Sequence, residues 1–107
     1  MSFAVEFTTG ARQDLLKIYH YIKSDGRPEM AKLLYVILSQ ACDSLSNNLE
    51  RGHVPSELEG LSEMLCRQIV IKNFRIIYQI VSNVVIIHGI IDGRRSIRET
   101  MRQRVLI

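Results

Sequence analysis

Apolar residues occur at every second position near the start of the chain and then change to helical spacing. Phe3, Val5 and Phe7 alternate with small or polar residues, which predicts a short strand with one buried face. Thr9-Gly10 follows as a candidate cap, and we expect a helix from about Ala11 to Ser24. Its apolar stripe consists of Ala11, Leu15, Ile18 and Ile22.

The next residues are typical of a tight turn between two helices. Asp25-Gly26-Arg27-Pro28 places a glycine where one helix can end and a proline where the next can begin. We expect the second helix from about Pro28 to Asn47, and the short connection predicts an antiparallel helical hairpin. Residues 47–62 are typical of a surface loop. The stripe of the second helix consists of Ala31, Leu34, Leu38, Ala41 and Leu45.

Strand-forming residues dominate from Met64 onward. Three runs, Met64–Ile71, Phe74–Val81 and Val84–Ile91, are separated only by Lys72-Asn73 and Ser82-Asn83. Both dipeptides are compatible with tight hairpin turns, so the runs predict a three-stranded antiparallel meander. Because the third run is apolar on both faces, we place it near the centre of the sheet.

A basic segment ends the chain. Residues 94–107 hold five arginines and one glutamate, and Ser96 can cap a short terminal helix. The full order predicts one α+β domain over residues 1–107, with the helical hairpin on one face of the sheet and the other face partly open. Guanidinium groups suit phosphate or carboxylate partners, so we expect a basic binding surface. Its candidate target-binding residues are Arg67, Arg75, Arg94, Arg95, Arg98 and Arg102.

Composition refines this picture without changing it. With 47% hydrophobic and 23% charged residues, the chain is typical of a folded domain, and its net charge of +3 is modest. Cys42 and Cys66 are far apart, so we interpret them as buried apolar residues in a reducing compartment. The three histidines are too scattered for a metal site. No apolar run could span a membrane, so we expect a cytoplasmic protein without membrane partner, metal or cofactor.

The strand Phe74-Arg75-Ile76-Ile77-Tyr78-Gln79-Ile80, the apolar run Val85–Ile91 and the step Gly93-Arg94-Arg95 resemble the RelE/ParE superfamily of toxins from type II toxin–antitoxin pairs. Members typically combine an aromatic-Arg-hydrophobic-hydrophobic-Tyr strand with a hydrophobic strand and a Gly-basic-Arg step into the last helix. The resemblance covers nearly the whole chain in element order and is most specific over residues 67–104. It implies the fold predicted above.

Two activities divide this superfamily. RelE-like members are metal-independent ribonucleases that cut messenger RNA in the ribosome, using lysines, arginines and often a terminal tyrosine, whereas ParE-like members bind and poison DNA gyrase. By this resemblance Arg75 and Arg95 match two arginines of the nuclease pattern. Cys66 and Gln68 stand where RelE-like members often carry lysines, and Met101 stands in place of the tyrosine.

These departures favour the ParE-like activity, with no catalytic residues. The resemblance then implies a toxin that inhibits gyrase, blocks replication and is neutralised by a cognate antitoxin in a hetero-oligomer. An acidic antitoxin tail would lie on the open sheet face or beside the helical hairpin. The alternatives are a ribosome-dependent mRNA interferase with Arg75 and Arg95 as phosphate-contacting groups, and an inactive relative that only binds antitoxin.

Several single residues keep more than one interpretation. Arg75 either contacts a target or pairs with a carboxylate across the sheet, and Arg67 either joins it in one patch or faces solvent alone. His88, in the most apolar strand, is interpreted as a satisfied core histidine and Tyr78 as a packed residue. Three tyrosines of the helical hairpin are also interpreted as packing residues: Tyr19, Tyr21 and Tyr35.

Overall fold

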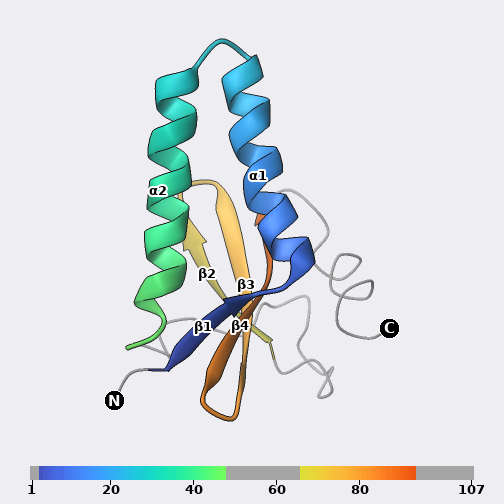
Figure 1. Ribbon diagram of the computed structural model, residues 1–107, viewed down its shortest axis with the longest axis vertical. Coiled ribbons are helices and arrows are strands. Elements are labelled where there is room, and N and C mark those ends of the chain that lie inside the picture. The colour runs from blue at the N-terminus through green and yellow to red at the C-terminus, as the bar shows by residue number, and fades with distance from the viewer. Residues whose placement is uncertain (1–2, 48–65, 94–107) are drawn as a thin grey trace.

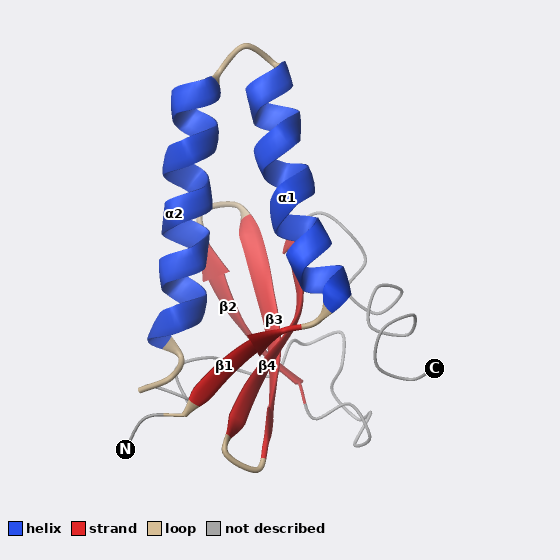
Figure 2. Cartoon of the chain, viewed as in Figure 1, coloured by secondary structure: helices blue, strands red, loops and turns tan. Residues whose placement is uncertain are grey.

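Two helices and a four-stranded sheet make up the described part of the protein, residues 3–47 and 66–93 of a computed structural model (Figure 1). The strand order is β1-β4-β3-β2, with β1 parallel to β4 and the other neighbours antiparallel. This arrangement confirms the α+β prediction, the meander and the interior position of the last strand (Figure 2). The elements are β1 (Ala4–Phe7), α1 (Thr9–Ser24), α2 (Pro28–Ser44), β2 (Cys66–Ile71), β3 (Phe74–Val81) and β4 (Val84–Asp92).

Helix α1 begins two residues earlier than the sequence pattern predicts. Thr8 is its N-cap, because the Thr8 hydroxyl oxygen accepts a hydrogen bond from the backbone N–H of Ala11 at 3.0 Å. The expected cap, Thr9-Gly10, therefore forms the first turn of the helix. The cap also ties the helix to the sheet, since the backbone N–H of Thr8 donates to the carbonyl of Ile87 on β4 at 3.0 Å.

Helix α2 begins at Pro28, as predicted, and ends three residues before the expected Asn47. A proline fits the first helical position because its missing N–H would have no partner within the helix. At the other end, the backbone N–H of Leu45 donates to the carbonyl of Cys42 at 3.1 Å. This contact spans three residues, so the helix tightens into a turn and stops at Ser44.

Both predicted hairpin turns are present. Lys72 and Ser82, the first residues of the two turns, have φ of 57° and 54°, in the left-handed region. The strand predicted from Met64 is described from Cys66 onward. The remaining expectations, the surface loop and the terminal helix, fall almost wholly on residues 48–65 and 94–107 and lie outside the described residues.

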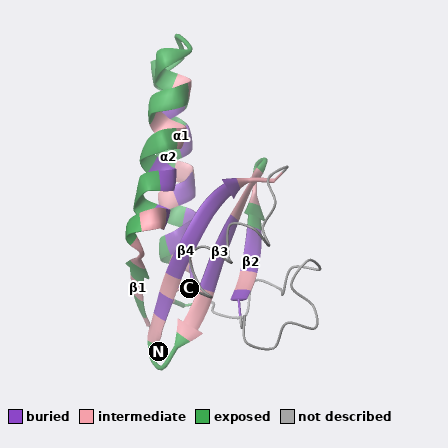
Figure 3. Cartoon of the chain, turned by 90° about the vertical axis from the view of Figure 1, so that its right-hand side faces the viewer, coloured by how far each residue is buried: buried purple, intermediate pink, exposed green. Residues whose placement is uncertain are grey.

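One face of the sheet packs against the helical hairpin and forms the main core. Tyr78 is 0% exposed in this core, which confirms that it is a packed residue. Phe3, Val5 and Phe7 pack against the same cluster, as their alternation predicts. Figure 3 shows the helices in one layer and β2, β3 and β4 in a second, and the two layers diverge toward the hairpin tip. The fully buried members with large side chains are Leu38, Leu45, Ile76, Tyr78, Val85, Ile87 and Ile90.

The second face of the sheet is less open than the sequence predicts. Residues at its middle are buried, and Ile77 is 0% exposed. Only the ends of this face are open, where Val70 is 57% and Val81 45% exposed. The expectation of a partly open face is therefore right at the ends of the face and wrong at its centre. The buried members are Cys66, Gln68, Ile77, His88 and Ile91.

Candidate functional site

Arg67 and Arg75, two of the predicted target-binding residues, lie on opposite faces of the sheet. Arg67 is opposite Tyr78, which belongs to the core under the helices, and Arg75 is opposite Val70 on the other face. Because successive side chains of a strand alternate between faces, the two arginines do not form one patch. Both are half-buried and both have interaction partners. The other candidates, Arg94, Arg95, Arg98 and Arg102, lie outside the described residues.

Arg75 lines a cavity of about 680 Å³, here called the strand-end cavity. It forms where the β2–β3 turn meets the end of β4. The backbone N–H of Gly93 donates to the carbonyl of Asn73 at 2.8 Å, and a Cβ on Gly93 would lie 3.2 Å from that oxygen. The chain therefore leaves β4 in close contact with the turn, and Arg94 follows directly. The other lining residues are Gln68, Val70, Lys72, Asn73, Asp92 and Gly93.

The β2 residues on the face of Arg75 are neutral. Cys66 and Gln68, which stand in place of the lysines of nuclease relatives, share this face with Arg75 because they alternate with Arg67. Burial raises the pKa of the Cys66 thiol from 9.0 to about 11, so the thiol is protonated at neutral pH. Gln68 is 7% exposed and its amide does not titrate. Neither side chain supplies an acid or base for catalysis.

His88 forms a hydrogen-bonded pair with Gln79 on the same face. Its Nε2 lies 2.9 Å from Oε1 of Gln79, and the ring is 8% exposed. The pairing register shifts here, so that Gly89 is opposite Ile77 while Ile87 is opposite Tyr78. His88 is the extra residue of this irregularity. The ring is therefore buried and hydrogen-bonded through Nε2, as the interpretation of His88 as a core histidine predicts.

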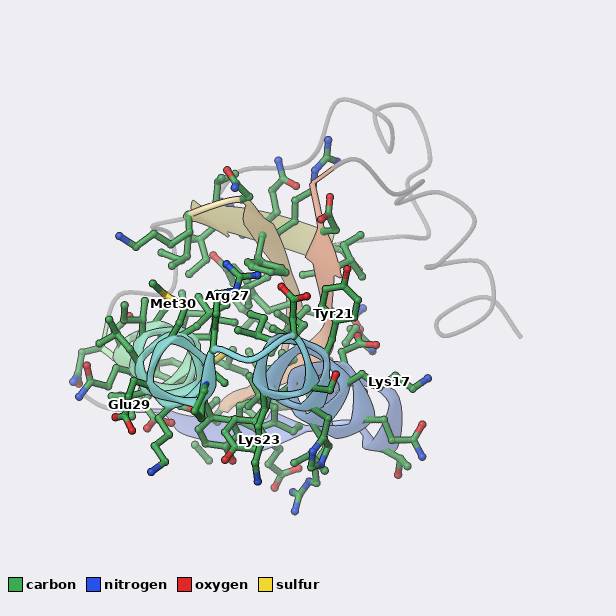
Figure 4. The ribbon with its side chains drawn as sticks, turned by 90° about the horizontal axis from the view of Figure 1, so that it is seen from above. Lys17, Tyr21, Lys23, Arg27, Glu29 and Met30 are labelled. Carbon is green, nitrogen blue, oxygen red and sulfur yellow. The ribbon has the colours of Figure 1, made fainter. Side chains whose placement is uncertain are left out.

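A second cavity, of about 520 Å³, lies between α1, the turn that connects α1 to α2, the start of β3 and the end of β4. We call it the α1–β4 cavity. Figure 4, a view from the hairpin tip, shows Tyr21 and Arg27 on the side of the hairpin that faces the sheet and Lys23 on the opposite side. The apolar lining residues are Ile18, Ile22, Phe74 and Ile90. The polar ones are Asp14, Lys17, Tyr21, Arg27 and Asp92.

Asp14, at this cavity, is the residue that sequence reasoning missed. It is 6% exposed, and its Oδ2 accepts a hydrogen bond from the backbone N–H of Ile90 at 3.0 Å. A signal for this role is present in the sequence, because Asp14 follows Ala11 by three positions and precedes Ile18 by four. A carboxylate beside the apolar stripe of a helix indicates a buried polar contact.

The three hairpin tyrosines differ in their surroundings. Tyr19 packs edge-on against Tyr35, with ring centroids 5.9 Å apart, as predicted. Tyr21 is 73% exposed, so the interpretation of Tyr21 as a packing residue is wrong. Its position on α1 points it to the rim of the α1–β4 cavity instead of the core. An exposed aromatic side chain beside a cavity is available to a partner.

Exposed apolar side chains gather on the helical hairpin. Of the eight large hydrophobic residues that are exposed in the described part, six lie on α1 and α2. Single exposed apolar residues are ordinary, but a concentration on one structural unit makes that unit a candidate interaction surface. We call this set the hairpin apolar surface, and it consists of Leu16, Tyr21, Met30, Leu33, Tyr35 and Val36.

The described residues contain no candidate metal site. Within residues 3–47 and 66–93, no three His, Cys, Asp or Glu side chains gather as metal ligands would. Cys42 and Cys66 are free and buried, which confirms their interpretation as apolar residues outside a disulfide. Of the helices described, none combines the length and hydrophobicity needed to cross a membrane.

The fold and the sequence motifs are those of the RelE/ParE toxins. The family described as the ParE toxin of the type II toxin–antitoxin system parDE matches residues 5–97, and the chain belongs to this family. This membership confirms the resemblance recognised from the strands and the Gly93-Arg94-Arg95 step.

Two solved structures share the fold. One, the chromosomal ParDE toxin–antitoxin system from P. aeruginosa, aligns with a TM-score of 0.71 and 20% identity over 85% of this chain and 96% of that chain. The other, the RelBE2 toxin–antitoxin complex from Mycobacterium tuberculosis, aligns with a TM-score of 0.56 and 24% identity over 86% and 92% of the two chains. No curated protein matches this chain. At these identities the structures establish the fold alone.

Proposed function

We propose that this ParE-family toxin of a type II toxin–antitoxin system inhibits DNA gyrase and thereby blocks replication. The observation that carries the proposal is that Cys66 and Gln68, the buried β2 side chains on the face of Arg75, are neutral. Metal-independent RNA cleavage needs a group that activates the 2′-hydroxyl and cations that stabilise charge on the phosphorus. A thiol with a pKa of about 11 and a buried amide, at Cys66 and Gln68, supply neither at neutral pH.

The proposed target contacts are the arginines at and beyond the strand-end cavity. Arg75 lines that cavity, and the chain passes from Gly93 at its wall directly to Arg94 and Arg95. Guanidinium groups at the end of a rigid strand are well placed to bind carboxylates or phosphates of a large partner. We assign Arg98 and Arg102 to the same group, and Arg67, on the other face of the sheet, to a separate contact.

A supercoiling assay tests the proposal. Purified toxin is titrated into gyrase acting on relaxed plasmid, and supercoiling should fall as the toxin is added. The double substitution Arg94→Ala and Arg95→Ala should weaken inhibition about tenfold or more, as expected for central arginine contacts. Arg12→Ala, an exposed arginine at the start of α1, is the matched control. Normal supercoiling at excess toxin would exclude gyrase as the target.

The second candidate is a ribosome-dependent mRNA interferase. One observation favours it: Arg75, a cation of the nuclease pattern, lines the strand-end cavity together with Lys72. This activity predicts cleavage of messenger RNA in a translating extract, and Arg95→Ala should abolish it. Intact message after incubation with the toxin would remove this candidate.

The proposed protein partner is a cognate antitoxin that binds the hairpin apolar surface. A disordered antitoxin tail that folds as an amphipathic helix could cover such a surface and form a hetero-oligomer. Without antitoxin the toxin should arrest growth, whereas an inactive relative would not. Gyrase and the ribosome are both cytoplasmic, so the proposal places the toxin in the cytoplasm.

A further inference from the structure

We infer that the strand-end cavity binds a carboxylate side chain of the target protein, and that Lys72 supplies the cation for this contact. The inference rests on the proposed function, because it takes gyrase as the target, and it names the chemical group that the toxin recognises there. Lys72 belongs to the described part of the chain and is not among the target-binding residues predicted from the sequence.

The described residues that line the strand-end cavity carry one net positive charge. Lys72 and Arg75 are cations, Asp92 is a carboxylate, and the other lining residues are neutral. Arg75 and Asp92 both have interaction partners. Lys72 is exposed and forms no ion pair with any residue that the structure describes, so its ammonium group is the cation that a partner can engage.

The turn between β2 and β3 fixes the backbone of Lys72 beside the cavity. Lys72 has φ of 57°, and the carbonyl of the next residue, Asn73, accepts the N–H of Gly93 at 2.8 Å. Glycine adopts such a left-handed φ without steric cost, whereas a residue with a Cβ is strained there. The lysine therefore provides a charge at the cavity in a position where glycine would give a more stable fold.

Backbone strain alone does not mark a binding site, because the turn between β3 and β4 is built in the same way. Ser82 has φ of 54°, and the carbonyl of Asn83 accepts the N–H of Ala4 at 3.3 Å. This turn lies at the opposite end of the sheet (Figure 1), and Ser82 does not line the strand-end cavity. The two turns share their backbone conformation and differ in the cation and the cavity, so Ser82 is a control for strain.

The lining favours a carboxylate over the phosphate backbone of a nucleic acid. A nucleic acid carries a charge on every phosphate and binds best to a surface with a large excess of cations. Asp92 would repel these phosphates, and the described lining has an excess of only one positive charge. Val70 lines the same cavity and is 57% exposed, so it can contact the methylene groups of a glutamate. An acidic side chain of a protein therefore complements this cavity better than a phosphate does.

Variants of the full-length toxin at the two turns test the inference. Lys72→Gln removes the charge and Lys72→Arg keeps it, while neither change relieves the backbone strain. Lys72→Gly and Ser82→Gly both relieve strain, but only the first removes a cation from the cavity. Titration calorimetry measures the binding of each variant to purified gyrase without DNA, and thermal unfolding measures its melting temperature.

Lys72→Gln and Lys72→Gly should raise the dissociation constant about tenfold, because the target carboxylate loses its cation. Lys72→Arg and Ser82→Gly should stay within about twofold of the wild type. Both glycine variants should melt about 4 °C or more above the wild type, because they relieve a left-handed conformation. Weaker binding by a more stable Lys72→Gly variant cannot result from unfolding.

Equal affinities of Lys72→Gln and Lys72→Arg would overturn the inference while leaving gyrase inhibition intact. Binding that requires DNA would also overturn it, because the toxin would then recognise phosphate. If the wild-type toxin neither binds nor inhibits gyrase, the proposed function itself fails, and the inference fails with it.

Discussion

The carboxylate of Asp14 on α1 accepts a hydrogen bond from the backbone N–H of Ile90 on β4, and the two atoms are 3.0 Å apart. This contact joins residues 76 positions apart in the chain. Strand β1 ends at Phe7, opposite Ile87, so it does not reach the part of β4 that contains Ile90. Asp14 therefore takes the place of a neighbouring strand for this amide and fixes the first helix over the end of β4.

Two substitutions of Asp14 distinguish the contribution of its hydrogen bond from that of its negative charge. Asp14→Ala should lower the free energy of unfolding by about 1–3 kcal/mol, because a buried backbone N–H loses its acceptor. Asp14→Asn keeps an acceptor oxygen at the same distance, so it should lower the free energy of unfolding clearly less than Asp14→Ala does. Urea denaturation of both variants measures the difference. Equal losses would mean that the charge of Asp14 matters and the hydrogen bond to Ile90 does not.

Gly93 controls how the chain leaves the sheet. A methyl group there would lie 3.2 Å from the carbonyl oxygen of Asn73, so Gly93→Ala should shift the following residues. We expect weaker gyrase inhibition by several-fold and a loss of stability below about 1 kcal/mol. Gly26→Ala is the control: Gly26 has φ of 79° and open space around it. That variant should lose about 1 kcal/mol of stability through backbone strain and inhibit normally.

The buried thiols predict a fall in stability at alkaline pH. Burial raises the pKa of Cys66 to about 11 and that of Cys42 to about 12, the latter also through the nearby charge of Asp43. Between pH 9 and these values the unfolded chain loses thiol protons that the folded chain keeps, so the free energy of unfolding falls as pH rises. Well below pH 9 both the folded and the unfolded chain keep the thiol protons, so the thiols contribute no pH dependence there.

The free energy of unfolding should fall by at most about 1.4 kcal/mol per pH unit for each thiol. Cys66→Ala, compared with the wild type by urea denaturation at pH 8, 9 and 10, should make the decline shallower. The same slope in both proteins would show that other groups dominate in this range. In the folded protein both thiols should also react with a thiol reagent only on the timescale of unfolding.

Local sequence patterns correctly predicted the helices and the hairpins. Helical spacing located both helices to within three residues at their ends, and Lys72-Asn73 and Ser82-Asn83 fixed the hairpins. The opposite faces of Arg67 and Arg75 also follow from the hairpin turn, because a two-residue turn pairs Val70 with Arg75. Arg67 lies three residues before Val70 and therefore points to the other face of the sheet.

Contacts between distant segments could not be predicted in this way. The parallel pairing of β1 with β4 and the bond between Asp14 and Ile90 depend on how the hairpin lies on the sheet. His88 is the extra residue of the register shift, so the β4 side chains that face the core change from odd-numbered to even-numbered positions there. Nothing in the apolar run of β4 predicts this change. The α1–β4 cavity depends on such a contact, because Asp14 and Ile90 both line it, and sequence reasoning therefore did not locate it.

The hairpin apolar surface gives the last prediction, which concerns antitoxin binding. Leu33 on α2 is 55% exposed, so Leu33→Asp should change stability by less than about 0.5 kcal/mol. If the antitoxin covers this surface, a buried and unpaired carboxylate should weaken the complex at least about tenfold. Val81→Asp, at a residue 45% exposed on β3, introduces the same charge away from the hairpin.

Two measurements separate these variants. Titration of purified antitoxin should give a higher dissociation constant for Leu33→Asp and an unchanged one for Val81→Asp. In cells, co-expressed antitoxin should relieve growth arrest by the wild type and by Val81→Asp but only partly by Leu33→Asp. Full relief in all three strains would place the antitoxin on another face of the toxin, because a charged residue in a buried apolar contact cannot be tolerated without loss of affinity.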